Sequence, residues 1–419
     1  MAAIILLLLI LLALALRQNI IVILLSGAAY VHLVWGDGKL EYLAEDLWIS
    51  LDNSLLLAIP MFLLAGAVMT RGSIARRLID LAISITKPIP GGLAVATILS
   101  CAIFASISGS SPVTLLAVGT IMYPALLEHG YNKRFALGAL TSGGTLGIII
   151  PPSIPLILYG IVTETSIADL FLAGIIPGIM IAVSLAGYSF WVNRKIPAQQ
   201  FDIVEFRTAI ARGGWSAMLP VILLGGIYSG YFSPTEAAAV ALVYALFVEV
   251  FIHRELKPID FFYTAIETAK MLGMLFPIVA VALSIKTILT IEEIPDDLAL
   301  WITTITDNKI AFLLAINLLL LLVGCLFDVI SAILILAPLL LIPATAYGVD
   351  PVHLGVIMVI NLEIGFLTPP LGLNLIVAMT AFRENFLEIS RAVLPFISLI
   401  LVVLLIVTFV PETTLLFVR

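Results

Sequence analysis

The chain has 419 residues, of which 62% are hydrophobic and only 11% charged, and its mean hydropathy is +1.20. A soluble core cannot bury this much apolar surface, so the composition excludes a soluble globular protein. The net charge of -7 carries little weight, because the position of charged residues determines the topology of a membrane protein. Cys101 and Cys325 lie in separate apolar runs without metal-ligand spacing, so neither a disulfide framework nor a zinc site is supported.

Apolar runs long enough to cross about 30 Å of hydrocarbon predict the membrane spans. In chain order they lie at 2–16, 19–35, 54–70, 135–160, 170–191, 215–232, 234–252, 271–289, 352–378 and 392–410. The first run lacks a basic start and a cleavage site, so we expect it to be a retained span rather than a signal peptide.

Two further apolar stretches, 91–127 and 309–347, are too long for one span and are interrupted by polar or helix-breaking residues. The first is interrupted at 108–112, called tip 1 below, and the second at 325–331, called tip 2. Each half has about 15–19 residues, which fits a helical hairpin that enters and leaves on one side of the membrane. Length alone also allows two complete spans.

The charges of the loops favour the hairpins, because Lys and Arg accumulate on the cytoplasmic side of a membrane. The basic segments are 71–87, 133–134, 193–214 and 253–257, and the acidic segments are 36–53, 161–169 and 291–307. We therefore expect the first hairpin to enter from the cytoplasm and the second from outside.

An internal repeat appears when 218 is added to positions in the first half. Pro151 and Pro152 then fall on Pro369 and Pro370, and Gly147 falls on Gly365. Most spans follow the same shift, as do two amphipathic segments, 73–87 and 291–305. Each half crosses the membrane an odd number of times, so the second copy starts on the opposite face.

The sequence therefore predicts an all-α polytopic membrane protein of two inverted repeats, each with about five transmembrane helices and one re-entrant helical hairpin. The expected domains are a first repeat at 1–192 with hairpin 91–127 and broken helix 135–160, a cytoplasmic linker at 193–214, and a second repeat at 215–419 with hairpin 309–347 and broken helix 352–378.

The two broken helices are interrupted at 143–152, called break 1, and at 361–370, called break 2. A helix break inside a membrane frees backbone N–H and C=O groups, which only protein, water, an ion or a substrate can satisfy. Hard cations bind oxygen ligands of this kind, so we predict a sodium ion at each pair of tip and break and no other metal. The predicted sodium-binding residues are Ser108, Gly109, Ser110, Ser111, Gly144, Thr145, Gly147, Asp328, Ser331, Gly365, Thr368 and Pro369. The alternative is that these small residues only permit close helix packing.

Half-helix N-termini carry partial positive charge, so we expect the substrate between the hairpins to be an anion. The predicted substrate-binding residues are Ser110, Thr114, Pro151, Pro152, Pro370 and Asn374. Asp328 and Glu363 are the acids most clearly at membrane depth, where an ionisable group is costly and usually functional. The role of Glu363 stays open between function and helix packing.

Four motifs resemble the large membrane subunit, the DctM-like M subunit, of the tripartite ATP-independent periplasmic (TRAP) transporters. They are SGSS at 108–111, GGTLGIIIPPSIPLILYG at 143–160, PTEAAA at 234–239 and NLEIGFLTPPLGLN at 361–374. The resemblance implies an elevator-type fold like that of the ion-transporter superfamily, in a multi-pass protein of the bacterial cytoplasmic (inner) membrane. It also implies a sodium-coupled importer of small organic acids, such as C4-dicarboxylates or sialic acid.

The same resemblance implies two protein partners, a small four-helix membrane subunit on a separate chain and a periplasmic substrate-binding protein. We expect no cofactor besides the coupling Na+ and no nucleic acid. The alternatives are a sodium-linked anion transporter or channel that acts without a binding protein, a structural scaffold, and an intramembrane serine protease. The protease is disfavoured because His129 lies at the far end of the hairpin from Ser108–Ser111, so we expect no enzyme.

Overall fold

The computed structural model describes residues 5–6, 8–9, 12–13, 16, 18–36 and 38–418. Most of these residues are helical and none of them forms a β-strand, and 10 helices are long and apolar enough to cross a membrane. The predicted all-α polytopic class is confirmed. The expected span 2–16 falls largely outside the described residues.

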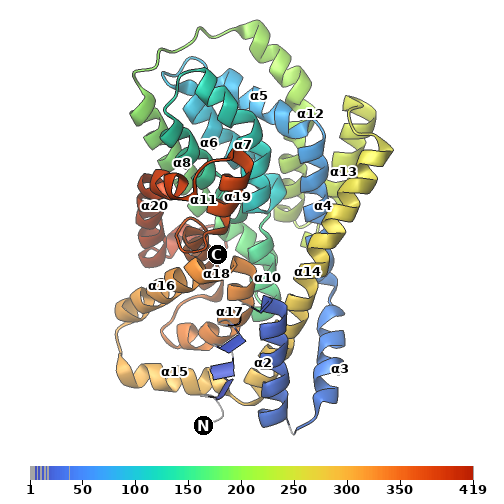
Figure 1. Ribbon diagram of the computed structural model, residues 1–419, viewed down its shortest axis with the longest axis vertical. Helices are drawn as coiled ribbons and strands as arrows, with labels where there is room; N and C mark the ends of the chain where they lie inside the picture. The colour runs from blue at the N-terminus through green and yellow to red at the C-terminus, as the bar shows by residue number, and fades with distance from the viewer. Residues whose placement is uncertain are drawn as a thin grey trace.

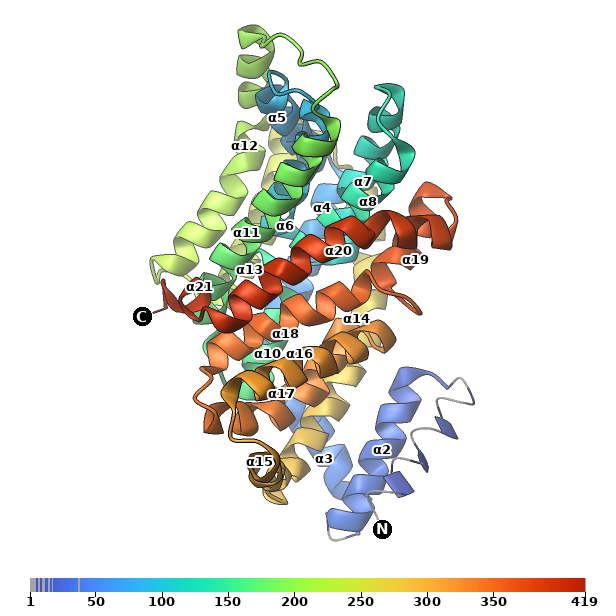
Figure 2. The same cartoon turned by 90° about the vertical axis from the view of Figure 1, so that its left-hand side faces the viewer.

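The first repeat begins with two helices that lie beside the long helix α14 at one end of the molecule (Figures 1 and 2). Its elements are α2 (Ile20–Trp35), α3 (Leu40–Leu51), η1 (Ser54–Leu57), α4 (Ala58–Arg71), α5 (Ile74–Thr86), α6 (Gly92–Ser108), α7 (Ser111–Glu128), α8 (Lys133–Gly143), α9 (Leu146–Ile149), α10 (Ile154–Thr163) and α11 (Ile167–Asn193). Helix α3 replaces the external loop expected at 36–53. Its Leu43 and Leu47 are four residues apart and pack with Leu24 of α2 and Val281 of α14.

The second repeat has α12 (Ile203–Tyr228), α13 (Pro234–Phe247), η2 (Val248–His253), α14 (Pro258–Ile291), α15 (Ile294–Ile305), α16 (Lys309–Leu326), α17 (Val329–Ala346), α18 (Pro351–Phe366), α19 (Leu373–Phe382), α20 (Phe386–Phe409) and α21 (Glu412–Leu415). Two boundaries differ from expectation. Helix α12 occupies the second half of the expected linker 193–214, and α14 begins at Pro258 rather than at 271. Both helices extend past the apolar window because Asp202 caps α12 and Pro258 occupies the first turn of α14.

Both interrupted stretches fold as hairpins that close on themselves. Gly109 has a φ of 61°, a left-handed conformation that glycine adopts readily, and it ends α6 just before α7 begins. In the second hairpin, Lys309 at the start of α16 donates to the carbonyl of Gly348 beyond the end of α17, with an Nζ–O distance of 2.8 Å. The rings of Phe312 and Tyr347 stack beside this contact, with their centroids 4.2 Å apart.

The helices of the two halves correspond at the offset of 218 residues. Helix α7 and helix α17 match at both ends, and α5 corresponds to α15. Figure 1 shows α5 near one end of the molecule and α15 near the other, as an inverted repeat requires. One difference is that α14 is continuous, whereas its counterpart is divided into α3, η1 and α4, with Asn53 capping η1.

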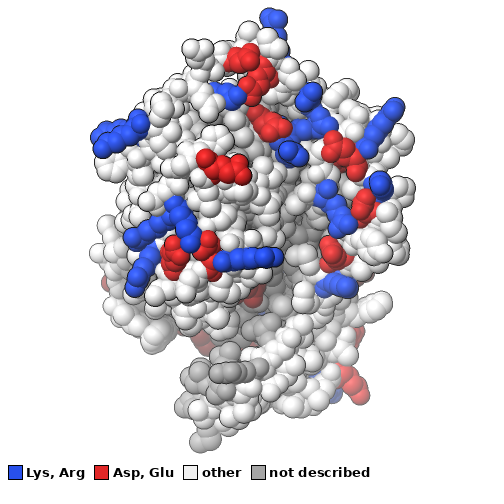
Figure 3. Space-filling model, turned by 45° about the horizontal axis from the view of Figure 1, so that its top comes forward, with Lys and Arg blue, Asp and Glu red and all other residues white. Residues whose placement is uncertain are grey.

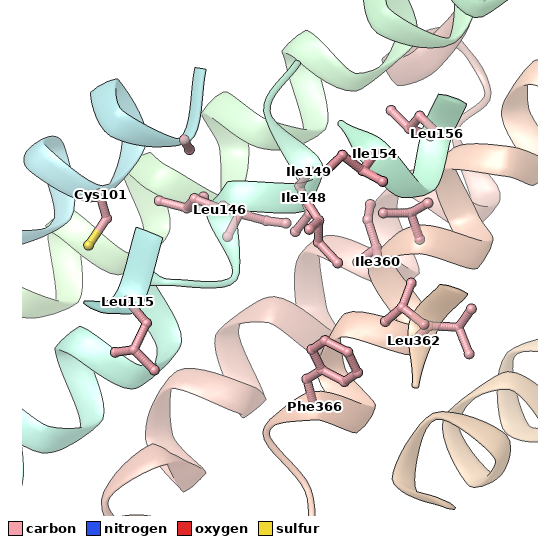
Figure 4. Packing of buried hydrophobic residues seen from close by; sticks show 14 of the residues in the cluster. Cys101, Leu115, Leu146, Ile148, Ile149, Ile154, Leu156, Ile360, Leu362 and Phe366 are labelled. Carbon is pink, nitrogen blue, oxygen red and sulfur yellow. The ribbon is translucent and has the colours of Figure 1, made fainter. Parts of the chain in front are cut away.

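The two broken helices pack together in the centre. Apart from its first two residues, Ile150 and Thr163, the whole of Lys133–Thr163 is buried inside the protein, so α8, α9 and α10 are shielded from lipid. Figure 4 shows Ile148 and Ile154 of the first half close to Ile360 and Leu362 of α18. Break 1 and the first part of break 2 are therefore held in one apolar core.

Lys and Arg side chains gather at the end of the molecule that carries α5 (Figure 3). Three ion pairs join the elements there: Arg71 to Asp260, Arg77 to Glu255 and Lys87 to Glu205. Under the positive-inside rule this end faces the cytoplasm, in agreement with the expected orientation.

Candidate functional site

A cavity of about 260 Å³ lies where the two hairpin tips meet. Tip 1 contributes Gly109 and Ser110, tip 2 contributes Asp328, and the opposite wall is formed by Met271 and Met274 of α14. The two repeats therefore share one cavity, and residues that are far apart in the sequence form it together.

Four helices begin at this cavity. Its lining includes first-turn or capping residues of α7 and α10 in the first repeat, and of α17 and α19 in the second. Each helix N-terminus carries roughly half a positive charge on its free N–H groups. Among the described residues that line the cavity, Asp328 is the only charged side chain. An anion in this cavity would therefore be held by helix N-termini rather than by Lys or Arg.

Tip 1 is a compact polar turn. The hydroxyl groups of Ser108 and Thr114 are 2.6 Å apart, and the Ser110 N–H donates to Ser108 Oγ at 3.4 Å. The carbonyl of Gly109 accepts a hydrogen bond from the Ile154 N–H, at 3.2 Å, at the start of α10. This bond joins tip 1 to the helix that follows break 1.

Break 1 lies directly against tip 1. A Cβ atom on Gly147 would be 2.5 Å from both Ser110 O and Thr114 Oγ1, so only glycine allows this approach. Thr145 Oγ1 donates to the carbonyl of Ser142 at 2.5 Å, and Ser153 Oγ donates to that of Ile148 at the same distance. The structure thus brings the predicted residues of tip 1 and break 1 together.

Tip 2 is formed around Asp328, which caps α17. Its Oδ2 accepts a hydrogen bond from the Ser331 N–H at 2.9 Å, while the Ser331 hydroxyl is buried without a hydrogen-bond partner in the described protein. Asp328 is partly exposed and lines the cavity. The carboxylate thus neutralises the helix N-terminus and keeps oxygen lone pairs for another ligand.

Break 2 contacts the second hairpin backbone to backbone, at the residue just before tip 2. A Cβ atom on Gly365 would be 2.2 Å from the carbonyl carbon of Gly324, near the end of α16. The hydroxyl of Thr368 donates to the carbonyl of Ile364 at 2.8 Å. Pro369 and Pro370 are exposed, whereas Pro151 and Pro152 are buried. The two halves of the site therefore contain equivalent residues, but the proline pairs differ in solvent exposure.

The predicted substrate residues separate into groups. Ser110 lines the cavity, whereas Thr114, Pro151, Pro152 and Asn374 are buried outside its lining and Pro370 is exposed. Their assignment to the substrate stays a prediction. The apolar wall of α14 was not expected, because Met271 and Met274 have no polar atom that marks a site in the sequence.

Glu363 makes a contact that joins the two repeats. It is fully buried, and its Oε1 accepts from the Ser111 hydroxyl at 2.8 Å and from Asn374 Nδ2 at 3.3 Å. Asn374 Nδ2 also donates to Ser111 Oγ at 2.6 Å. A second buried network joins Asn361 of α18 to Asn317 of α16, at 2.6 Å. The sequence marked Glu363 as unusual but gave no partner for it.

Comparisons with known proteins agree with this architecture. Residues 5–413 match the sequence profile of the family described as "Tripartite ATP-independent periplasmic transporter, DctM component". The chain is 43% identical over 394 residues to the C4-dicarboxylate TRAP transporter large permease protein DctM of Pseudomonas aeruginosa, covering 93% of this chain and 92% of that protein. It is 36% identical over 384 residues to the ectoine TRAP transporter large permease protein TeaC of Halomonas elongata, covering 91% of this chain and 90% of that protein.

Another relative is longer than this chain. The isethionate TRAP transporter permease protein DctMQ of Oleidesulfovibrio alaskensis is 42% identical over 386 residues, which are 91% of this chain but 61% of that protein. Among solved structures, the YdaH transporter of Alcanivorax borkumensis matches with a TM-score of 0.66 at 16% identity, covering 90% of this chain and 89% of that one. At this identity the match supports the fold alone.

Proposed function

The chain belongs to the DctM family, the large permease component of TRAP transporters, and on this basis we propose that it is a sodium-coupled importer of a small organic acid. A TRAP permease is a transport protein rather than an enzyme, and it is a multi-pass protein of the bacterial inner membrane. The ion and the substrate class are our proposal and are argued below.

The observation that carries the proposal is the convergence of four helix N-termini on one cavity, three of which, those of α7, α10 and α19, have no carboxylate cap. Their partial positive charges favour an anion, and a low-dielectric surrounding strengthens the attraction. The cavity volume of about 260 Å³ is slightly below the range of roughly 300–1,000 Å³ that is common for drug-sized ligands. A small acid suits both the charge and the size.

Sodium coupling is supported by the two pairs of tip and break. Each pair places serine or threonine hydroxyls and closely packed glycines together, and tip 2 adds the carboxylate of Asp328. Oxygen ligands of this kind suit Na+ better than a transition metal. An inward-moving positive charge gains about 2.3 kcal/mol per 100 mV of membrane potential, so two or more ions would drive the uptake of an anion.

We propose a small membrane subunit and a periplasmic substrate-binding protein as partners, because the family is that of a tripartite transporter. The substrate stays open within the class of small acids. The relatives carry the names of C4-dicarboxylate, isethionate and ectoine transporters, and sialic acid is a further candidate that the family resemblance implies.

The test is uptake into liposomes that contain this chain and its small partner. Labelled C4-dicarboxylate, isethionate, ectoine and sialic acid would be offered with and without an inward Na+ gradient and a cognate binding protein. Saturable uptake of one compound that requires both Na+ and the binding protein supports the proposal. Uptake that needs neither would favour the alternative, an anion transporter or channel that acts without a binding protein.

A further inference from the structure

We propose that Glu363 and Asn374 hold an additional sodium ion between the two repeats, separate from the ions expected at the two pairs of tip and break. This inference rests on the sodium coupling proposed above. Its starting point is the fully buried carboxyl group of Glu363, which contacts tip 1 through Ser111 although it belongs to α18 of the second repeat.

The first argument is the charge of Glu363. An ionised carboxylate that is fully buried costs several kcal/mol unless a positive charge or several hydrogen bonds compensate it. Glu363 makes no ion pair with Lys, Arg or His in the described part of the chain, and its hydrogen bonds come from the neutral groups of Ser111 and Asn374. A bound cation would supply the missing charge.

The second argument concerns the remaining side-chain oxygens of Glu363 and Asn374. Glu363 Oε2 and Asn374 Oδ1 are both buried without a hydrogen-bond partner. The orientation of the Asn374 amide follows from its neighbours, since Nδ2 faces the acceptors Glu363 Oε1 and Ser111 Oγ. These two oxygens, one of them from a carboxylate, are of the kind that a hard cation prefers as ligands.

The third argument comes from the repeat. At the offset of 218 residues, Glu363 corresponds to Thr145 and Asn374 corresponds to Leu156. The first broken helix therefore forms with a neutral hydroxyl and an apolar side chain at these positions. The carboxylate is not needed to build a broken helix of this kind, so a separate role explains it better than packing does.

The position of the site indicates how a bound ion would link the two repeats. Ser111 is the first residue of α7 beside the cavity, whereas Glu363 lies in break 2 and Asn374 follows it. An ion held by Glu363 would thus tie tip 1 of the first repeat to break 2 of the second. Occupation of this site would stabilise the arrangement in which both repeats close on the substrate cavity.

The experiment counts the Na+ ions bound at saturation per chain, with ²²Na+ and the purified protein in lipid nanodiscs. Glu363→Gln keeps the size of the side chain and removes its charge, so we expect the loss of one bound ion relative to wild type. Glu363→Val, which has the shape of Thr145 in the first repeat without its oxygen, and Asn374→Leu, which copies Leu156, keep the test valid if Glu363→Gln fails to fold. Each should also lose one ion.

The matched control is His353→Gln. His353 is buried on the same helix but lies outside break 2, and its ring contacts Thr414 instead of Ser111. This variant should bind as many ions as wild type. If the Glu363 and Asn374 variants also bind as many ions as wild type, the inference is overturned, whether or not the pH dependence of their Na+ binding changes. Failure of wild type to bind Na+ at all would instead overturn the proposed function, so the two failures are distinguishable.

Discussion

Replacement of Gly365 by alanine tests whether the close approach of hairpin 2 and break 2 is essential. An added Cβ atom would lie 2.2 Å from the carbonyl carbon of Gly324, 2.4 Å from its oxygen and 2.5 Å from its Cα. Carbon atoms pack favourably at about 3.5–4.0 Å, so α16 and α18 must move apart by more than about 1 Å. The obstacle is backbone, which no rotamer change can relieve.

The magnitude follows from two opposing effects. Overpacking a buried contact costs about 1–3 kcal/mol, and a clash with backbone belongs at the upper end of this range. Alanine in place of glycine inside a helix returns about 1 kcal/mol. We therefore expect Gly365→Ala to lower the free energy of unfolding by about 2 kcal/mol.

The assay is thermal unfolding in detergent, monitored by circular dichroism. Na+-dependent uptake is measured for the same variants. The control is Gly225→Ala in α12, where an added Cβ would have no atom within 4 Å, so only the gain in helix propensity applies. The reasoning is refuted if Gly365→Ala melts at or above the temperature of Gly225→Ala. If the folded fraction of Gly365→Ala keeps the wild-type Na+ affinity, Gly365 serves packing alone.

The remaining predictions concern the tips, the topology and one structural carboxylate. Asp328→Ala and Ser110→Ala should each weaken Na+-dependent uptake without preventing membrane insertion, and unchanged Na+ affinity in both variants would contradict the proposed ion sites. Cysteines introduced at Asp297 and Arg77 should be labelled from opposite sides of the membrane by an impermeant reagent, and labelling from one side would refute the inverted repeat. Glu249→Ala should lower the melting temperature, because the carboxylate accepts two 2.7 Å hydrogen bonds from backbone N–H groups at the start of α5, and each buried unpaired N–H costs about 1–3 kcal/mol. An unchanged melting temperature would mean that water replaces the carboxylate.

Much of the fold follows from local signals in the sequence. Hairpins and broken helices are marked by glycine, serine and proline within long apolar runs, which is why α7 and α17 lie at the predicted offset. Helix α3 was missed because acids at its exposed positions resemble a loop, although Leu43 and Leu47 have helical spacing. The early start of α14 was missed because Asp260, Glu267 and Lys270 interrupt the apolar run before residue 271.

Only part of the site could be predicted from the sequence, and the rest was missed for a physical reason. Each tip can be paired with its break from the sequence, because the repeat indicates which segments are equivalent. The contact of Glu363 with Ser111 joins residues 252 positions apart and depends on how the two repeats dock. The difference in exposure between Pro151 and Pro369 also arises from this docking, which local patterns do not determine.

The composition of the cavity suggests why the ion and the substrate should be coupled. Among its described lining residues, Asp328 carries the only charge, and this charge is negative. An anionic substrate would be repelled by a bare carboxylate there, despite the helix N-termini around it. A sodium ion on Asp328 would remove the repulsion, so Na+ should raise the affinity for the substrate, and by linkage the substrate should raise the affinity for Na+ by the same factor. The acid at tip 2 would then prevent the substrate from binding without its ion, which is the condition that a symporter needs in order to avoid a leak.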